Sequence, residues 1–110
     1  MKRYCLTLKL RQDPKLVAEY IEYHRTGWPA VHQSIRAAGV LDMQLYELDG
    51  SVFMIMDCAD DFSFERKAQM DRDNQTVQEW ERLMERFQDV GPDADVSAKW
   101  RLMRKIFELA

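Results

Sequence analysis

The residues best suited to chemistry lie in the stretch EYIEYHRTGWPAVHQ, residues 19–33, where Tyr20 and His24 are four residues apart. Side chains with this spacing lie one turn apart on the same face of a helix. Histidine gives and takes protons near neutrality, because its ordinary pKa is about 6.5. His24 is therefore the leading candidate for proton transfer, and the alternative is a histidine that only stabilises the end of a helix. His32 follows the break, and its alternatives are a position near His24 or one that simply faces solvent, of which we favour the second.

Two tryptophans and one carboxylate extend this candidate set. Trp28 and Trp80 suit either core packing or the aromatic wall of a sugar site, since a flat ring covers the apolar face of a pyranose. Glu81 follows Trp80 directly and suits either solvent or the rim of such a pocket. Two histidines without a well-spaced carboxylate are no metal site, and the chain has no nucleotide-binding glycine loop, so we expect neither metal nor cofactor.

Helices must position these side chains. We expect the first helix to begin at Pro14, after an aspartate that can accept hydrogen bonds from the first-turn amides. Trp28 precedes a proline, which disfavours helical backbone at the tryptophan, and Gly27 tolerates the angles of a bend. The helix should therefore stop or kink there, resume at Pro29 and end near Gly39.

Strands flank this helical region. Residues 3–10 alternate apolar and polar side chains, as in a strand with one buried face. Residues 40–58 are typical of two strands joined by a tight turn at Asp49 and Gly50. The second of these strands is apolar on both faces. Since one helical layer covers only one face, we expect the other face to pack against a second subunit.

The second half of the chain contains further helical segments, followed by a loop and a last strand. We expect a helix over 62–70 and another that opens with a capping box of Thr76 and Glu79. Residues 91–97 should form a loop, and residues 102–109 the last strand. The resulting β-α-β-β-α-β order predicts an α+β, ferredoxin-like sandwich.

The composition limits the classes of function. A chain of 110 residues, 46% apolar and 32% charged, is typical of one globular domain spanning residues 1–110. Its net charge of −3 argues against nucleic acid as a partner. We interpret Cys5 and Cys58 as reduced packing residues. The chain has neither a signal-like start nor a membrane-length apolar run, so we expect a cytoplasmic protein without membrane contact.

The pattern Tyr-x-x-x-His-x-x-x-Trp-Pro, carried by Tyr20, His24, Trp28 and Pro29 with a helix ending at Gly39, resembles the L-rhamnose mutarotase family. The likeness extends over essentially the whole chain and includes QEWERLM, which places Trp80 at a family tryptophan. The resemblance implies a dimeric α/β barrel that interconverts the anomers of 6-deoxyhexoses without a cofactor. It also implies that His24 donates the proton and that Tyr20 contacts the sugar.

Two positions depart from the family pattern. A rhamnose-binding tyrosine falls at Met43 here, and the second tryptophan of a Trp-Trp pair falls at Glu81. These changes suit a differently configured ring, and we expect L-fucose to be preferred over L-rhamnose. We expect Trp28, Met43 and Trp80 to contact the sugar together with Tyr20. Glu81 is our candidate for the base, with a bound water or Asp42 as alternatives.

Two other functions are compatible with the expected fold. One is a cofactor-free monooxygenase of the dimeric ferredoxin-like barrel type, which would place histidine and tryptophan in an aromatic cavity. The other is a non-enzymatic ligand-binding module, in which His24 would be structural. An RNA-recognition domain has the same order of elements, but the strand VFMIMDC lacks the basic and stacking residues that RNA binding needs.

Overall fold

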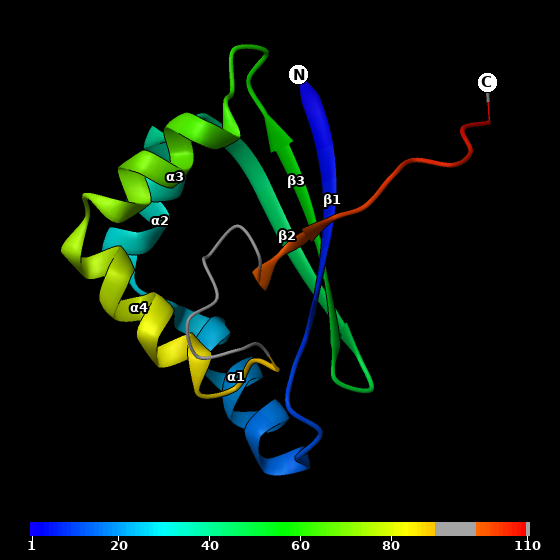
Figure 1. Ribbon diagram of the computed structural model, residues 1–110, viewed down its shortest axis with the longest axis vertical. Coiled ribbons are helices and arrows are strands. Elements are labelled where there is room, and N and C mark those ends of the chain that lie inside the picture. Colours follow the sequence, from blue (N-terminus) through cyan, green and yellow to red (C-terminus); the bar gives the residue numbers. More distant parts are fainter. Residues whose placement is uncertain (90–98, 110) are drawn as a thin grey trace.

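The computed structural model describes residues 1–89 and 99–109. Its strands are Lys2–Lys9 (β1), Val40–Leu48 (β2), Ser51–Cys58 (β3) and Arg101–Leu102 (β4), and its helices are Pro14–Thr26 (α1), Pro29–Ala37 (α2), Phe64–Arg72 (α3) and Gln75–Glu85 (α4). Among the described residues, the strands form one antiparallel sheet of order β2-β3-β1-β4, with the helices on one face (Figure 1). This arrangement confirms the predicted α+β, ferredoxin-like sandwich.

The hairpin of β2 and β3 forms where the sequence predicts it. Asp49 has a φ of 50° and Gly50 a φ of 83°, the left-handed conformations that a two-residue turn requires. The Glu47 carboxylate accepts a hydrogen bond of 2.8 Å from the amide of Gly50. Directly opposite positions on the inner face, such as Leu45 and Met54, pair apolar side chains beneath the helices.

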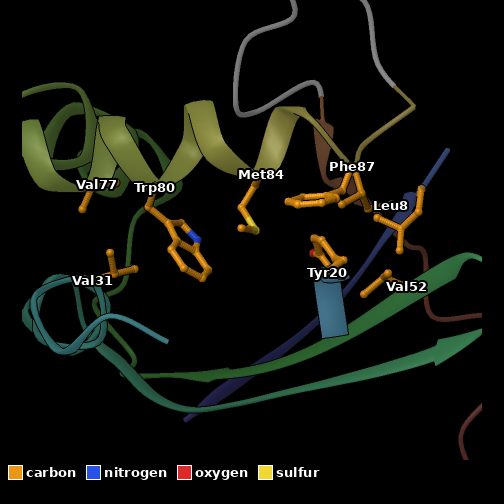
Figure 2. Packing of buried hydrophobic residues seen from close by; sticks show 9 residues of the cluster. Leu8, Tyr20, Val31, Val52, Val77, Trp80, Met84 and Phe87 are labelled. Atoms are coloured by element: carbon orange, nitrogen blue, oxygen red, sulfur yellow. The ribbon is translucent and has the colours of Figure 1, made fainter. Parts of the chain in front are cut away.

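The inner face of the sheet and the helices enclose the core. The apolar stripe of α4 continues past the end of the helix, and it consists of Val77, Trp80, Met84 and Phe87, all buried. Figure 2 shows these side chains directed toward Tyr20 of α1, Val31 of α2, and Leu8 and Val52 of the sheet. Trp80 and Tyr20 thus belong to the core as well as to the candidate site.

Two helix starts differ in detail from the sequence analysis. The expected helix over 62–70 begins at Phe64, after Ser63, whose hydroxyl accepts from the amide of Arg66 at 3.2 Å. The capping box predicted at Thr76 and Glu79 is wrong. Asn74 caps α4 instead, because its side-chain oxygen accepts from the amide of Val77 at 3.1 Å.

The last strand is much shorter than predicted. Within residues 99–109, only Arg101 and Leu102 pair with β1. The amide of Met103 donates one further hydrogen bond to the carbonyl oxygen of Cys5. Residues 103–109 then extend away from the sheet on the side opposite the helices (Figure 1). Ile106, Phe107 and Leu109 are strongly exposed. The prediction of a strand over 102–109 is therefore wrong beyond Leu102, because no strand among the described residues pairs with that segment. The loop predicted over 91–97 lies outside the described residues.

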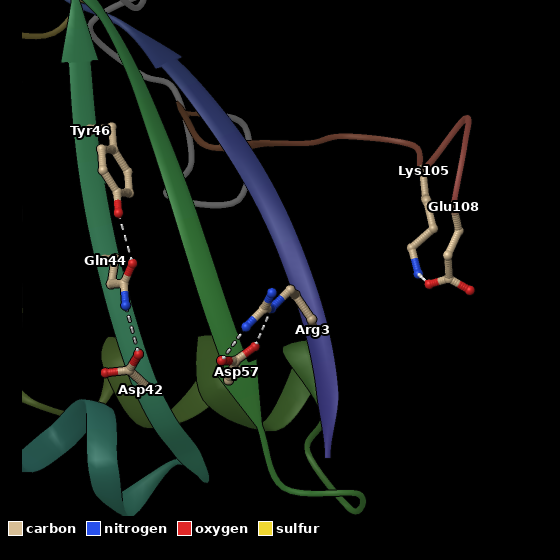
Figure 3. A network of polar contacts seen from close by, with 7 residues as sticks. All are labelled: Arg3, Asp42, Gln44, Tyr46, Asp57, Lys105 and Glu108. Atoms are coloured by element: carbon tan, nitrogen blue, oxygen red, sulfur yellow. Dashed lines mark hydrogen bonds and ion pairs between the residues drawn. The ribbon is translucent and has the colours of Figure 1, made fainter. Parts of the chain in front are cut away.

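The outer face of the sheet carries polar pairs beside apolar side chains. Arg3 donates two hydrogen bonds to Asp57, at 2.7 and 3.0 Å, and Gln44 bridges Asp42 and Tyr46 (Figure 3). The half-buried side chains of Phe53 and Ile55 lie on the same face, and no helix within the described ranges covers them. No helix there is long and apolar enough to cross a membrane.

The two cysteines lie on opposite faces of this sheet. Cys5 is opposite Ile55, and Cys58 is opposite Lys2, so the two cysteines are three positions apart along the ladder and point to opposite faces. Cys58 is fully buried in the inner cluster, whereas Cys5 is half-buried, and both are free thiols. This agrees with the interpretation of both as reduced packing residues.

We predict that Gly50→Ala lowers the free energy of unfolding by about 1–2 kcal/mol, because an L side chain disfavours the left-handed conformation. Its new Cβ would meet only the end of the flexible Gln12 side chain, so backbone strain dominates. Asp49→Asn is the matched control and should stay within about 0.5 kcal/mol, since asparagine suits this turn. Urea unfolding measures both, and equal stability of the alanine variant and wild type would contradict the turn assignment.

Candidate functional site

The break between α1 and α2 has the geometry that the sequence predicts. Trp28 is extended, with φ −115° and ψ 122°, and Pro29 is the first residue of α2. Gly27 has a φ of 61°, which an L side chain rarely adopts, and a Cβ there would also clash with the imidazole of His32. The break therefore ends α1 just beyond His24 and turns α2 across the sheet.

A cavity of about 820 Å³ lies between the helices and the inner face of the sheet. Its volume is within the range of small-molecule sites. Every site residue predicted from the sequence lines it: Tyr20, His24, Trp28, Met43, Trp80 and Glu81. The elements α1, β2 and α4, together with the break that holds Trp28, thus bring these residues to one space.

His24 is held by its own helix. Its Nδ1 lies 2.8 Å from the carbonyl oxygen of Tyr20. A carbonyl only accepts hydrogen bonds, so Nδ1 carries the hydrogen and Nε2 is left to exchange a proton. The imidazole also packs on Tyr20, with ring centroids 4.4 Å apart, and meets Trp80 edge to face at 5.4 Å. These contacts fix the tautomer and the direction of the ring.

The surroundings of His24 favour its neutral form. Burial lowers the pKa of the imidazole, and the nearby His32 lowers it further, while the hydrogen bond to Tyr20 opposes both effects. His32 is exposed to solvent, as expected, and it also lines the cavity. Gly27 explains its position, because only the missing side chain lets His32 pack beside the break.

Trp28 and Trp80 form the aromatic wall of the cavity. Their ring centroids are 5.1 Å apart with an interplanar angle of 67°, an edge-to-face pair. Trp80 is buried and Trp28 is half-buried. The sequence left core packing and a cavity wall as alternatives, and the structure gives these rings both roles.

Glu81 lies in the wall of the same cavity on α4, with only 19% of its side chain exposed. Burial raises the pKa of its carboxyl, and the cation of Lys99 opposes that rise. Burial and the charge of Glu81 together raise the pKa of the Tyr20 hydroxyl, so Tyr20 stays a neutral hydrogen-bond donor. Asp42, the alternative base, also lines the cavity. It is less suited to that role, since its carboxylate accepts a hydrogen bond of 3.2 Å from Gln44 on the outer face of the sheet.

Sequence reasoning missed several polar residues of the cavity. Lys67 and Asp71 of α3 form an ion pair of 2.8 Å, and both side chains are largely buried. Gln88 is 2% exposed, and its side-chain oxygen has no hydrogen-bond partner in the described parts of the chain. The i,i+4 spacing of Lys67 and Asp71 is visible in the sequence, but the burial of this pair is not. Nothing in the sequence marks Gln88 as a buried residue of the cavity. No group of three metal-ligating side chains occurs among residues 1–89 and 99–109.

Comparison with known proteins identifies the family. The sequence profile of L-rhamnose mutarotase matches residues 3–109. The chain belongs to this family. It is 34% identical to an L-fucose mutarotase from Xanthomonas campestris pv. campestris, over all of this chain and 90% of that protein. It is also 27% identical to a protein designated UPF0734 from Dictyostelium discoideum, over 98% of this chain and 90% of that one.

Solved structures share the fold. An L-rhamnose mutarotase from Formosa agariphila superposes with a TM-score of 0.75 at 20% identity, with full coverage of both chains. Tetracenomycin F2 cyclase from Streptomyces glaucescens, a type-II polyketide cyclase, matches with a TM-score of 0.59 at 18% identity, again over both full chains. The same fold therefore supports different chemistries, and the family, not the fold, assigns the activity.

Family membership makes this protein a sugar isomerase, a mutarotase of the L-rhamnose and L-fucose type. It decides against both a cofactor-free monooxygenase and a non-enzymatic binding module. It also makes the substrate of the protein a monosaccharide.

We predict that His24 titrates below about pH 6.5, the ordinary midpoint for histidine, because burial penalises the imidazolium form. Above that midpoint its Nδ1 should keep the hydrogen. Two-dimensional ¹⁵N–¹H NMR of the imidazoles reports both the midpoint and the tautomer. His32→Gln should raise the midpoint of His24 by removing a like charge, and an unchanged midpoint would mean that the two imidazoles do not interact.

Proposed function

We propose that the protein interconverts the α and β anomers of a 6-deoxyhexose by acid and base catalysis, with His24 as the acid and Glu81 as the base. The observation that carries this proposal is the hydrogen bond from Nδ1 of His24 to Tyr20, which leaves Nε2 free in a cavity that Glu81 also lines. Both groups sit among aromatic side chains that suit the apolar face of a pyranose.

The reaction needs two proton transfers. The surroundings favour the neutral imidazole, and the reacting form is the fraction in which Nε2 of His24 also carries a proton. Nε2 then gives this proton to the ring oxygen as the bond between that oxygen and the anomeric carbon breaks. The carboxylate of Glu81 takes the proton of the anomeric hydroxyl, which becomes the carbonyl of an open-chain aldehyde. After rotation about the bond between C1 and C2, both transfers reverse and the ring closes on the other face. His24 and Glu81 return to their starting protonation states.

The environments of the two groups suit this exchange. Burial brings the pKa of His24 down and that of Glu81 up, so the affinities of donor and acceptor for the proton approach each other. When the pKa values of the donor and the acceptor differ little, protons can be transferred in both directions, as a reversible anomer exchange requires. Tyr20, held neutral beside Glu81, is suited to donate a hydrogen bond to the sugar.

L-fucose is our proposed preferred substrate over L-rhamnose. The full-length similarity to an L-fucose mutarotase supports this choice. Met43 and Glu81 line the cavity at the two positions where the chain departs from the rhamnose-type pattern. A thioether and a carboxylate offer a sugar different contacts from two aromatic rings, and a changed hydroxyl configuration is selected by such polar contacts.

Saturation-transfer NMR between the anomeric protons of L-fucose and L-rhamnose tests the activity. We predict that His24→Ala and Glu81→Gln each lower the exchange rate at least about 100-fold, the usual contribution of one proton-transfer group. Arg25→Ala and Glu79→Gln, at exposed neighbouring positions, are the matched controls and should exchange at the wild-type rate.

Circular dichroism should give the same fold for all four variants. Exchange at the wild-type rate in His24→Ala would remove its role, and the same result in Glu81→Gln would return the base to a bound water. A higher kcat/KM for L-rhamnose than for L-fucose would contradict the proposed preference.

We also propose that the protein is a homodimer through the outer face of the sheet. Phe53 and Ile55 lie on this face, and the chain of residues 103–109, in which Ile106, Phe107 and Leu109 are exposed, runs out on the same side of the sheet (Figure 1). A second copy would bury both sets and give the extended segment a neighbour.

Analytical ultracentrifugation should give twice the mass of one chain for the wild type. Phe53→Glu should produce a folded monomer, because the dimer would bury an unpaired charge. Ile21→Glu is the control, since Ile21 is exposed on α1 in the helical layer, and it should remain dimeric. A monomeric wild type at micromolar concentration would refute the dimer, and a dimeric Phe53→Glu would place the interface elsewhere.

A further inference from the structure

A buried lysine lies behind the candidate base. The side chain of Lys99 is 1% exposed, and its ammonium lies 2.6 Å from Oε1 of Glu85 and 4.0 Å from Oε2 of Glu81. Lys99 stands two residues before β4, far in the sequence from both glutamates. A charge buried to this extent is costly unless it is paired. The two carboxylates of α4 supply that pairing.

Helical spacing brings the two carboxylates to one cation. Glu81 and Glu85 are four residues apart on α4, so their side chains lie on one face of the helix. Their like charges repel each other, and Lys99 between them offsets that repulsion. Glu85 makes the short contact and is 39% exposed, whereas Glu81 makes the longer contact and also lines the cavity. The contact with Glu85 anchors Lys99, and Glu81 is the carboxylate left for the substrate.

We propose that Lys99 is a positioning residue that keeps Glu81 an anion directed at the cavity, with Glu85 holding Lys99 in place. This inference rests on the proposed role of Glu81 as the base. Lys99 does not line the cavity, so it acts on the sugar only through Glu81.

The charges around Glu81 give the expected direction. Burial disfavours its carboxylate, Lys99 is the largest opposing influence, and Lys67 of α3 assists it. Asp71 of α3 and Glu85 of α4 act in the opposite sense, and the Tyr20 hydroxyl of α1 is neutral. Without Lys99, the effect of burial on the pKa of Glu81 is opposed less strongly, so Glu81 stays protonated to higher pH. Without the charge of Glu85, Lys99 interacts with the carboxylate of Glu81 only, so Glu81 ionises at lower pH.

Two measurements on the full-length protein test this. The first is the ¹³C NMR titration of the Glu81 side-chain carboxyl, assigned with Glu81→Gln. The midpoint should move up by about one pH unit in Lys99→Met, the effect of losing an opposite charge about 4 Å away, and move down in Glu85→Gln. Lys99→Arg should restore most of the wild-type midpoint. Lys15→Met, which removes a positive charge from the exposed start of α1, should leave it unchanged.

The second measurement is the pH dependence of anomer exchange. Its ascending limb, where Glu81 ionises, should move in the same directions, so that Lys99→Met is about tenfold slower at pH values below both midpoints. Loss of a merely structural lysine would lower the rate equally at all pH values.

The outcomes separate the two proposals. An unmoved Glu81 midpoint in Lys99→Met overturns the role of Lys99. Should Lys99→Met fail to fold, Glu85→Gln decides, since a midpoint that is unmoved or raised there also overturns it. Wild-type exchange in Glu81→Gln together with a shifted Glu81 midpoint in Lys99→Met would refute the base and leave the effect of Lys99 on Glu81 intact.

Discussion

The backbone cannot easily remain helical at the residue before a proline, and the cavity depends on that restriction at Trp28. Because the chain turns there, the last turn of α1 is not continued over the sheet, and α2 starts in a new direction with Trp28 as its N-cap. His24 stands in that last turn, where the carbonyl of Tyr20 fixes its Nδ1. One local constraint thus sets the end of the helix, the aromatic wall and the direction of the imidazole.

The cavity is built from the protein core itself. Tyr20, Trp80 and Met84 pack in the central cluster and also line the cavity (Figure 2). A site made from core side chains is rigid, because each ring is held by close packing on its other sides. Burial is also the largest influence on the pKa of both His24 and Glu81. The packing of the core therefore both stabilises the fold and shifts the pKa values of His24 and Glu81.

Local sequence patterns predicted most of the fold and five of the six cavity residues named from the sequence, whereas Met43 was named only through the resemblance to the family. The spacing of Tyr20 and His24, the Trp28 break and the stripe that includes Trp80 depend on residues within a few turns, which periodicity describes well. The last strand was overestimated, since the composition of a segment does not show whether a partner strand lies beside it. The contacts of Lys99 with α4 join distant parts of the chain, and no local pattern encodes them.

The position of Cys58 has a consequence for the chemical durability of the protein. Its sulfur is sealed under the helices, and burial together with the adjacent Asp57 raises the pKa of the thiol. A thiol that stays protonated is a poor nucleophile and reacts slowly with oxidants and alkylating agents. Oxidation of Cys58 therefore requires that the helical layer first separate from the sheet.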